Sequence, residues 1–280
     1  MPDSRAQPSA SWHRALRTVA TATVMLCACA TAWAPATGRA ASAVQSSQAH
    51  TVSLTATFTP ERLGAGTTIR VGFGIATPPG RAPSPVTDVE LLLPPGLAIA
   101  SSDLGLETCE PAKLESEGFA GCPPDSLMGR GSAAAEVPFG SGFVTERAPI
   151  RLFWGPLQEG HPQLLFFAEG EAPVLANIIF GALVLPAPAP FGGALNARLP
   201  LVPSVRGGPD VALVHLETTI GAKGIVYTEH SKGKTIHFRP RGIVLPGSCP
   251  HGGFSFAARL SFQDATQASA TTVVKCPRAH

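Results

Sequence analysis

Residues 89–133 read VELLLPPGLAIASSDLGLETCEPAKLESEGFAGCPPDSLMGRGSA. The apolar run at the start ends at two prolines, and because proline cannot donate to a sheet ladder, this run predicts a strand that stops there. Cys109 and Cys122 follow. Between them, Pro111 and Gly118 stand where a short helix would begin and end. The stretch therefore predicts a strand, then a helix of one or two turns between two cysteines, and then a second strand.

The segment that opens at Cys122, CPPDSLMGRGSA, contains two closely spaced glycines, Gly129 and Gly131. It lacks the G-K-[ST] ending and the following helix of a phosphate-binding loop. We therefore expect the glycines to permit a β-bulge or a close contact between strands.

Alternating apolar residues predict further strands on both sides of this stretch. Residues 51–59 show the pattern clearly, because Val52, Leu54, Ala56 and Phe58 share one face. The other predicted strands are 67–76, 86–93, 126–137, 143–154, 163–169, 174–185, 194–199, 211–219, 224–228, 235–238, 253–262 and 270–275.

About a dozen short strands with almost no helix predict an all-β fold. We expect an antiparallel β-sandwich, Ig-like or jelly-roll-like, whose one short helix lies between Cys109 and Cys122. The sequence leaves open whether this is one sandwich or two packed β subdomains with a boundary near residues 155–175.

The amino-terminal segment has the pattern of an export signal. Arg14 and Arg17 precede an apolar stretch at 18–34, and Ala41-Ser42-Ala43 matches a leader-peptidase site. This predicts a signal peptide at 1–43, a β domain at 44–280, and a secreted or extracellular protein. The alternative is a membrane-anchored lipoprotein acylated at Cys29, because residues 26–29 resemble a lipobox.

Four cysteines remain after such cleavage: Cys109, Cys122, Cys249 and Cys276. In an exported chain they predict two disulfides, and of the three possible pairings the two local ones are the simplest. No CxxC pair and no finger-spaced histidines are present, so we expect neither a zinc site nor another cofactor.

Charge is sparse and unevenly distributed. Charged residues make up 14% of the chain, and residues 223–278 carry eight basic and two acidic ones. Lys232, Lys234, Arg239 and Arg241 form a candidate surface for an anionic cell-envelope polymer or another surface protein. The alternative is a solvated hairpin tip at residues 231–234. We expect no nucleic-acid partner, because few aromatic residues are available for base stacking.

Two patterns resemble catalytic motifs without their context. The residues 251–254, HGGF, resemble the oxyanion loop of esterases, but no G-x-S-x-G accompanies them, so we expect a turn beside Cys249. Four glutamates at 107, 110, 115 and 117 crowd the predicted short helix, where a solvated face is expected in place of a pair of carboxylates across a cleft.

The run LLLPPGL, the Cys122 segment, and the stretches VTERAPIRLFWGP (144–156) and PGSCPHGGFSF (246–256) together resemble a group of uncharacterised secreted actinobacterial proteins with a CPxxSxxGxGxA segment. The resemblance implies an exported, predominantly β protein and carries no activity. The sequence thus predicts a disulfide-stabilised protein of the cell envelope or extracellular space with a non-enzymatic structural or interaction role. The alternative is a secreted hydrolase acting on an extracellular polymer or ester.

Overall fold

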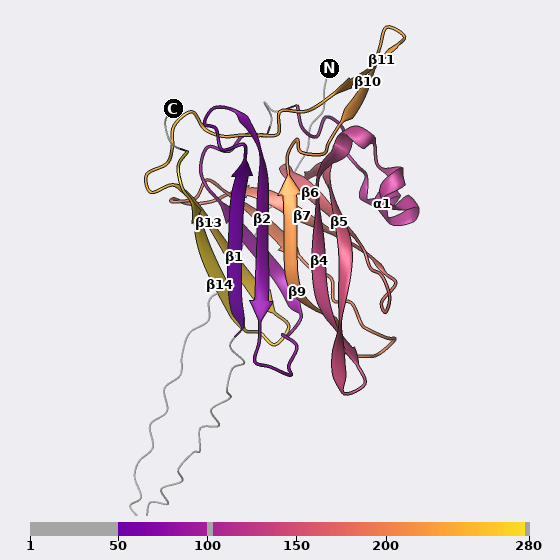
Figure 1. Ribbon diagram of the computed structural model, residues 1–280. Coiled ribbons are helices and arrows are strands. Elements are labelled where there is room, and N and C mark those ends of the chain that lie inside the picture. Colours follow the sequence, from indigo (N-terminus) through magenta and orange to yellow (C-terminus); the bar gives the residue numbers. More distant parts are fainter. Residues whose placement is uncertain (1–49, 100–102, 278–280) are drawn as a thin grey trace, which may run out of the picture. The chain divides into compact units, whose positions relative to one another are not determined.

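The computed structural model describes residues 50–99 and 103–277 of the 280-residue chain. The predicted signal peptide and the alternative acylation site at Cys29 lie outside the described residues. Figure 1 shows the arrangement of the strands and of the short helix.

Most of the described chain is antiparallel β-structure. The strands are β1 (Thr51–Thr59), β2 (Gly66–Ala76), β3 (Val86–Leu93), β4 (Leu127–Phe139), β5 (Gly142–Gln158), β6 (His161–Glu169), β7 (Asn177–Pro186), β8 (Gly193–Arg198), β9 (Ala212–Ile220), β10 (Tyr227–Ser231), β11 (Lys234–Phe238), β12 (Ile243–Val244), β13 (Phe254–Phe262) and β14 (Gln267–Val274). The helical elements are α1 (Pro111–Glu117) and two 3-10 turns, η1 (Gly118–Gly121) and η2 (Pro124–Ser126).

One sheet contains all strands except the β10–β11 hairpin. Its order is β1-β2-β9-β4-β5-β6-β7-β8-β3-β13-β14, and β12 adds to β2. The two end strands, β1 and β14, lie side by side, so the sheet is nearly closed and its inner faces meet across one core (Figure 1). The prediction of an all-β antiparallel fold with one short helix between Cys109 and Cys122 is confirmed.

Large side chains fill the end of the core at which β1 finishes and β13 begins. Phe58 meets Phe254 edge-on at 5.1 Å between ring centres and lies 5.9 Å from Phe256. Met128, at the start of β4, is fully buried in the same cluster. Alternation along each strand explains this packing, because every second side chain points inward.

The stretch that opened the sequence analysis folds as predicted. β3 ends at Leu93 before the two prolines, and α1 spans Pro111–Glu117. Leu114 of α1 is fully buried in a small apolar cluster with Phe153 and Phe167, on the outer side of the main sheet. The sequence pattern therefore indicated both the helix and its boundaries.

The two glycines after Cys122 serve both predicted purposes. The ladder between β4 and β5 shifts register between Leu127 and Gly129, which is a bulge. A Cβ on Gly129 would collide with the carbonyl oxygen of Thr219, and one on Gly131 with that of Glu217. Glycine is therefore required where β4 approaches the backbone of β9 this closely.

Some strand boundaries differ from the predicted ones. Residues 174–176 were expected to begin a strand, but β7 starts only at Asn177. The preceding residues form a loop, because the Gly170 amide donates to the Ala176 carbonyl and the Val174 amide donates to the Glu146 carboxylate. The two-residue β12 carries too little alternation to be predicted at all.

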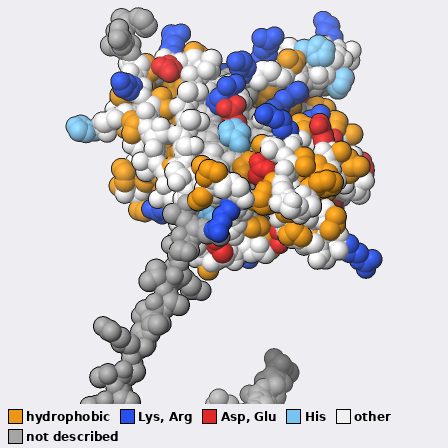
Figure 2. All heavy atoms as spheres, turned by 60° about the horizontal axis from the view of Figure 1, so that its bottom comes forward, with side chains coloured by type: hydrophobic (Ala, Val, Ile, Leu, Met, Phe, Trp, Pro, Cys, Tyr) orange, Lys and Arg blue, Asp and Glu red, His pale blue; other side chains and the backbone are white. Residues whose placement is uncertain are grey.

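Two disulfides, Cys109–Cys122 and Cys249–Cys276, join the four cysteines in the local pairing. Such bonds persist in compartments outside the reducing cytosol. The helices at residues 50–99 and 103–277 are all too short to cross a lipid bilayer. Figure 2 views the molecule from the end at which β1 begins, where apolar side chains gather over part of the surface.

Candidate functional site

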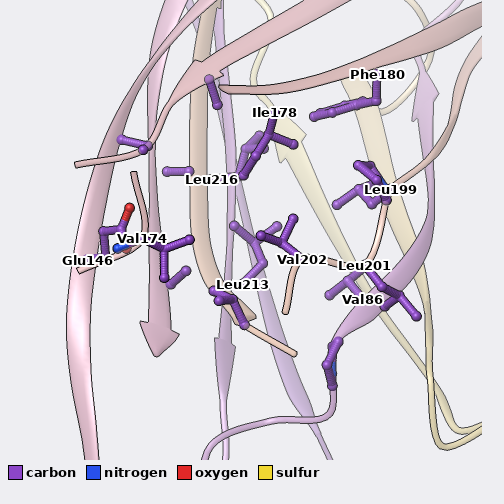
Figure 3. Close-up of a pocket in the computed structure, with 18 of the residues that line it drawn as sticks. Val86, Glu146, Val174, Ile178, Phe180, Leu199, Leu201, Val202, Leu213 and Leu216 are labelled. Carbon is purple, nitrogen blue, oxygen red and sulfur yellow. The ribbon is translucent and has the colours of Figure 1, made fainter. Parts of the chain in front are cut away.

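An apolar cavity of about 110 Å³ lies inside the sheet, at the end opposite the phenylalanine cluster (Figure 3). Its walls come from β3 to β7, from β9 and from the loop after β8. Apart from one glutamate, the lining residues are apolar or glycine: Pro85, Val86, Ala133, Ala135, Ala148, Ile150, Ala168, Gly170, Val174, Ile178, Phe180, Leu199, Pro200, Leu201, Val202, Val211, Leu213 and Leu216.

Small residues at inward positions create this space. β4 contributes Ala133 and Ala135, β5 contributes Ala148, and β6 contributes Ala168. Leu152 and Leu164, further along β5 and β6 toward the other end, are fully buried core residues. The sheet thus keeps its alternation along its length but changes from large to small inward side chains, which leaves one end hollow.

A second, deeper cavity of about 50 Å³ adjoins the first. The two share Phe180, Leu199 and Leu216 as lining residues. Engineered apolar cavities of roughly 150 Å³ bind benzene or xenon. The interior space is therefore on the scale of a small ring or a short hydrocarbon segment.

Of the described residues that line the larger cavity, Glu146 is the one with a charge, and only 8% of it is exposed. Its Oε2 accepts a hydrogen bond from the Val174 amide at 3.2 Å. Its Oε1 accepts none from the described part of the chain. Figure 3 places this carboxylate at the edge of the cavity, beside Val174. A molecule in the cavity could donate a hydrogen bond to the free oxygen.

Backbone hydrogen bonds hold the loops around the cavity in place. In the β8–β9 loop, the Val211 amide donates to the Val202 carbonyl and the Ser204 amide to the Pro209 carbonyl, at 2.8 and 2.9 Å. The Leu199 amide donates to the Thr87 carbonyl at 2.8 Å. These bonds fix the walls of the cavity on the side of β3.

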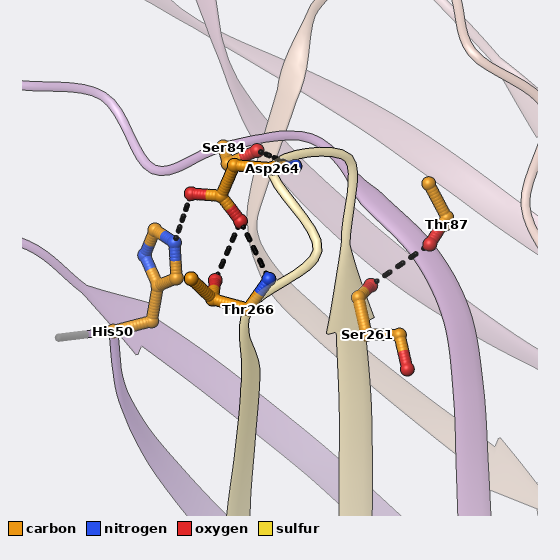
Figure 4. Close-up of polar contacts among 6 residues, drawn as sticks. All are labelled: His50, Ser84, Thr87, Ser261, Asp264 and Thr266. Atoms are coloured by element: carbon orange, nitrogen blue, oxygen red, sulfur yellow. Dashed lines mark hydrogen bonds and ion pairs between the residues drawn. The ribbon is translucent and has the colours of Figure 1, made fainter. Parts of the chain in front are cut away.

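A polar cluster joins the start of β1, the β2–β3 loop and the β13–β14 turn at the same end of the sheet (Figure 4). The Asp264 carboxylate accepts hydrogen bonds from the Thr266 hydroxyl and amide and lies 3.5 Å from Nε2 of the buried His50. The Asp264 amide donates to the Ser84 hydroxyl at 3.1 Å. Burial raises the pKa of Asp264, but the bonds from Thr266 and the neighbouring His50 outweigh it, so this pKa lies below its usual value of 3.8.

A second hollow, of about 1110 Å³, lies on the outer face of β3, β8, β13 and β14. Four of its five charged residues form two ion pairs, Arg198 with Asp88 at 3.5 Å and Arg259 with Glu90 at 2.8 Å, and the fifth is Glu159. Because these groups already satisfy each other in solvent, we place the candidate site in the apolar cavity.

The structure spreads the four predicted basic residues along the β10–β11 hairpin and beyond it. Lys232 is in the turn, Lys234 begins β11 and Arg239 follows its end, and all three are exposed. Arg241 pairs with Asp103 at 3.3 Å. At about 3.4 Å per residue, Lys234 and Arg239 lie roughly 17 Å apart along the strand. These residues form a basic edge without a compact pocket.

Tyr227 anchors this hairpin to the main sheet. Its fully buried ring meets Phe238 edge-on at 5.7 Å, its hydroxyl donates to the Leu127 carbonyl at 2.7 Å, and it accepts from the Gly105 amide at 2.9 Å. Burial raises the pKa of Tyr227 to about 12, the Gly105 amide opposes the rise, and the charge of Asp125 adds to it.

The two patterns that resemble catalytic motifs form a turn and a solvent-exposed helix face, as expected. His251 is exposed in a turn closed by a hydrogen bond from the Gly253 amide to the Pro250 carbonyl. The glutamates at 107, 110, 115 and 117 are exposed on or beside α1. No group of three or more potential metal ligands occurs among residues 50–99 and 103–277.

The sequence analysis missed the cavity and Glu146. The available signals were the alanines at 133–135 and a lone glutamate that shares an alternating strand face with Ala148, Ile150 and Leu152. The alanines could not show that the strands opposite also leave space. Comparison with known proteins finds no matching protein family, no matching curated protein and no matching solved structure.

Proposed function

We propose that this chain is an exported, disulfide-stabilised binding protein of the cell envelope or extracellular space, with a non-enzymatic role. It holds a small, mostly apolar molecule inside the sheet. The observation that carries the proposal is the apolar cavity of about 110 Å³ with a single, nearly buried carboxylate at its edge.

An empty cavity of this size is costly. Protein interiors are close-packed, and residual cavities destabilise by about 24 cal/mol per Å³. For the larger cavity this sets an upper limit of about 3 kcal/mol, because the cavity reaches solvent at Leu201, and a bound apolar molecule would offset this cost. The ring of hydrogen-bonded loops around the cavity supports a built site in preference to a packing defect.

Glu146 defines the polar part of the ligand. One carboxylate oxygen is occupied by the Val174 amide, and the other faces no donor from the described residues. A ligand with one hydroxyl or amine on an apolar body would satisfy it, and hydrogen bonds to a charged acceptor are stronger than neutral ones. We therefore expect the protein to prefer benzyl alcohol to toluene.

The test measures binding of toluene and benzyl alcohol by calorimetry. Ala133→Leu fills the cavity and should abolish binding of both probes. Ala134→Leu adds the same volume on the opposite face of β4, because successive side chains alternate, and should leave binding unchanged. If the wild type binds neither probe, or if both variants lose binding alike, the proposal is wrong.

Glu146→Gln tests the polar contact separately. The amide oxygen can still accept from Val174, whereas the amide nitrogen cannot accept from a ligand hydroxyl. The preference for benzyl alcohol should weaken while toluene still binds, because a neutral amide that donates to the hydroxyl replaces the stronger bond to a charged acceptor. An unchanged preference would show that Glu146 does not meet the ligand.

A further inference from the structure

Exposed apolar side chains concentrate at the end of the sheet that contains the cavity. Among the described residues, twelve large apolar side chains are exposed, and six of them lie at this end, in the β4–β5 hairpin and in the β6–β7 and β8–β9 loops. The most exposed are Leu175 at 82%, Phe139 at 68% and Val205 at 66%. Together we call these six the apolar rim: Phe139, Phe143, Val144, Leu175, Leu201 and Val205.

The apolar rim and the cavity are parts of the same loops. In the β6–β7 loop, Val174 lines the cavity while the next residue, Leu175, points outward. In the β8–β9 loop, Leu201 is 42% exposed and also lines the cavity, and Val202 follows it on the cavity wall. Figure 3 shows Val174, Leu201 and Val202 around the cavity, and Figure 2 shows the apolar surface at this end.

Hydrogen bonds hold the backbone of the rim loops, so the exposure of the rim side chains does not arise from a frayed loop. The Val174 amide is held by Glu146, and Ala176 accepts from the Gly170 amide at 2.8 Å. Val205 stands in a turn in which its carbonyl accepts from the Gly208 amide at 2.8 Å. The hydrogen-bonded backbone therefore holds these apolar side chains in contact with water, which is an unfavourable arrangement for a free surface.

We propose that the apolar rim docks on the surface of a lipid bilayer and that the cavity takes its ligand from that bilayer; the second part rests on the proposed function. Charge favours this partner, because the segments that carry the rim have few exposed charges and these are of both signs: Glu171 and Arg206 in the two loops and Arg147 in the β4–β5 hairpin. A nearly neutral apolar surface fits a lipid interface, into which such side chains insert. It does not fit an anionic polymer.

The point at which the described chain begins agrees with this orientation. His50 lies at the rim end, where it contacts Asp264 in the β13–β14 turn (Figure 4). The 49 residues before it include the apolar stretch at 18–34. If the chain is acylated at Cys29, the tether joins the β domain at the end that the rim would place on the membrane.

The experiment measures co-flotation of the exported protein with neutral phosphatidylcholine vesicles. It uses the form released into the culture supernatant, after its mass has shown that no acyl group is attached. Leu175→Asp and Val205→Asp should each weaken partitioning about tenfold, equivalent to about 1.4 kcal/mol. Leu157→Asp is the matched control, because Leu157 is also 66% exposed but lies at the far end of β5. It should partition like the wild type.

Every other outcome overturns the docking proposal. Absence of vesicle binding, equal losses in all three variants, or binding that needs anionic lipid and disappears in high salt would each do so. The last result would implicate the basic hairpin instead. Ala133→Leu separates the two proposals: it should float with vesicles but bind no toluene. A protein that binds toluene but never floats would refute docking and leave the proposed function standing.

Discussion

Removal of one hydroxyl, by Tyr227→Phe, should weaken the attachment of the β10–β11 hairpin. The hydroxyl satisfies the Leu127 carbonyl and the Gly105 amide, at 2.7 and 2.9 Å. A buried polar group without its partner costs about 1–3 kcal/mol. Because both backbone groups are only partly buried, we expect a total loss of about 2 kcal/mol in the free energy of unfolding at pH 8.

The same residue predicts a defined alkaline transition. The unfolded chain loses the phenol proton near pH 10, and the folded protein near pH 12. Between these values the unfolded state binds fewer protons, so stability falls as the pH rises. A rise of about two pKa units corresponds to about 3 kcal/mol at most. The stability advantage of the wild type over Tyr227→Phe should therefore shrink from pH 10 upward.

The assay is direct, because the chain contains one tyrosine. Tyrosinate absorbance of the folded protein reports the pKa of Tyr227, and urea unfolding of both proteins at each pH reports the energies. Lysines that titrate in the same range are common to both proteins and cancel in the difference. Tyrosinate formation near pH 10 in the folded protein, or no loss of stability in the variant at pH 8, would refute the reasoning.

Three further predictions concern the hairpin, the polar cluster and a disulfide. Glu substitutions at Lys232 and Lys234 should abolish salt-sensitive retention on an anionic polysaccharide column; unchanged retention, or none for the wild type, would remove the predicted anionic surface. The lowered pKa of Asp264 means that its contribution is present above the usual carboxyl pKa and is lost as the pH falls through the folded value. Asp264→Asn should therefore flatten the acid side of the thermal stability profile, and an unchanged slope would contradict the assignment. Serine at both Cys109 and Cys122 should cost about 3 kcal/mol in urea unfolding, from the loop entropy of a separation of 13 residues; an unchanged unfolding midpoint would show that the bond does not constrain the unfolded chain.

Local signals in the sequence predicted most of the strands and the one helix. Two-residue alternation identified β1 and β2 to within a residue, and Pro111 with Gly118 located α1. These predictions succeed because neighbouring residues determine where these strands and this helix begin and end. The local disulfide pairing follows from the same proximity along the chain.

The sequence did not predict the features that depend on contacts between residues far apart in the chain. Alternation tells which face of a strand is buried but not what the opposite strands present, so the cavity could not be predicted. In the sequence Glu146 resembles any other charged residue, because its one donor among the described residues, the Val174 amide, comes from a loop 28 residues away. Near-closure of the sheet depends on β1 meeting β14, which no local pattern encodes.

The two ends of the sheet differ in how closely they are packed. Both disulfides, α1 and the cluster of Phe58, Phe254 and Met128 lie at one end. The cavity, the nearly buried Glu146 and the apolar rim lie at the other, where empty volume and exposed apolar surface both cost free energy. Sites that break the rules of packing are tolerated when the rest of the fold compensates for them. The concentration of covalent and aromatic packing at one end is therefore the physical condition that allows the other end to remain hollow.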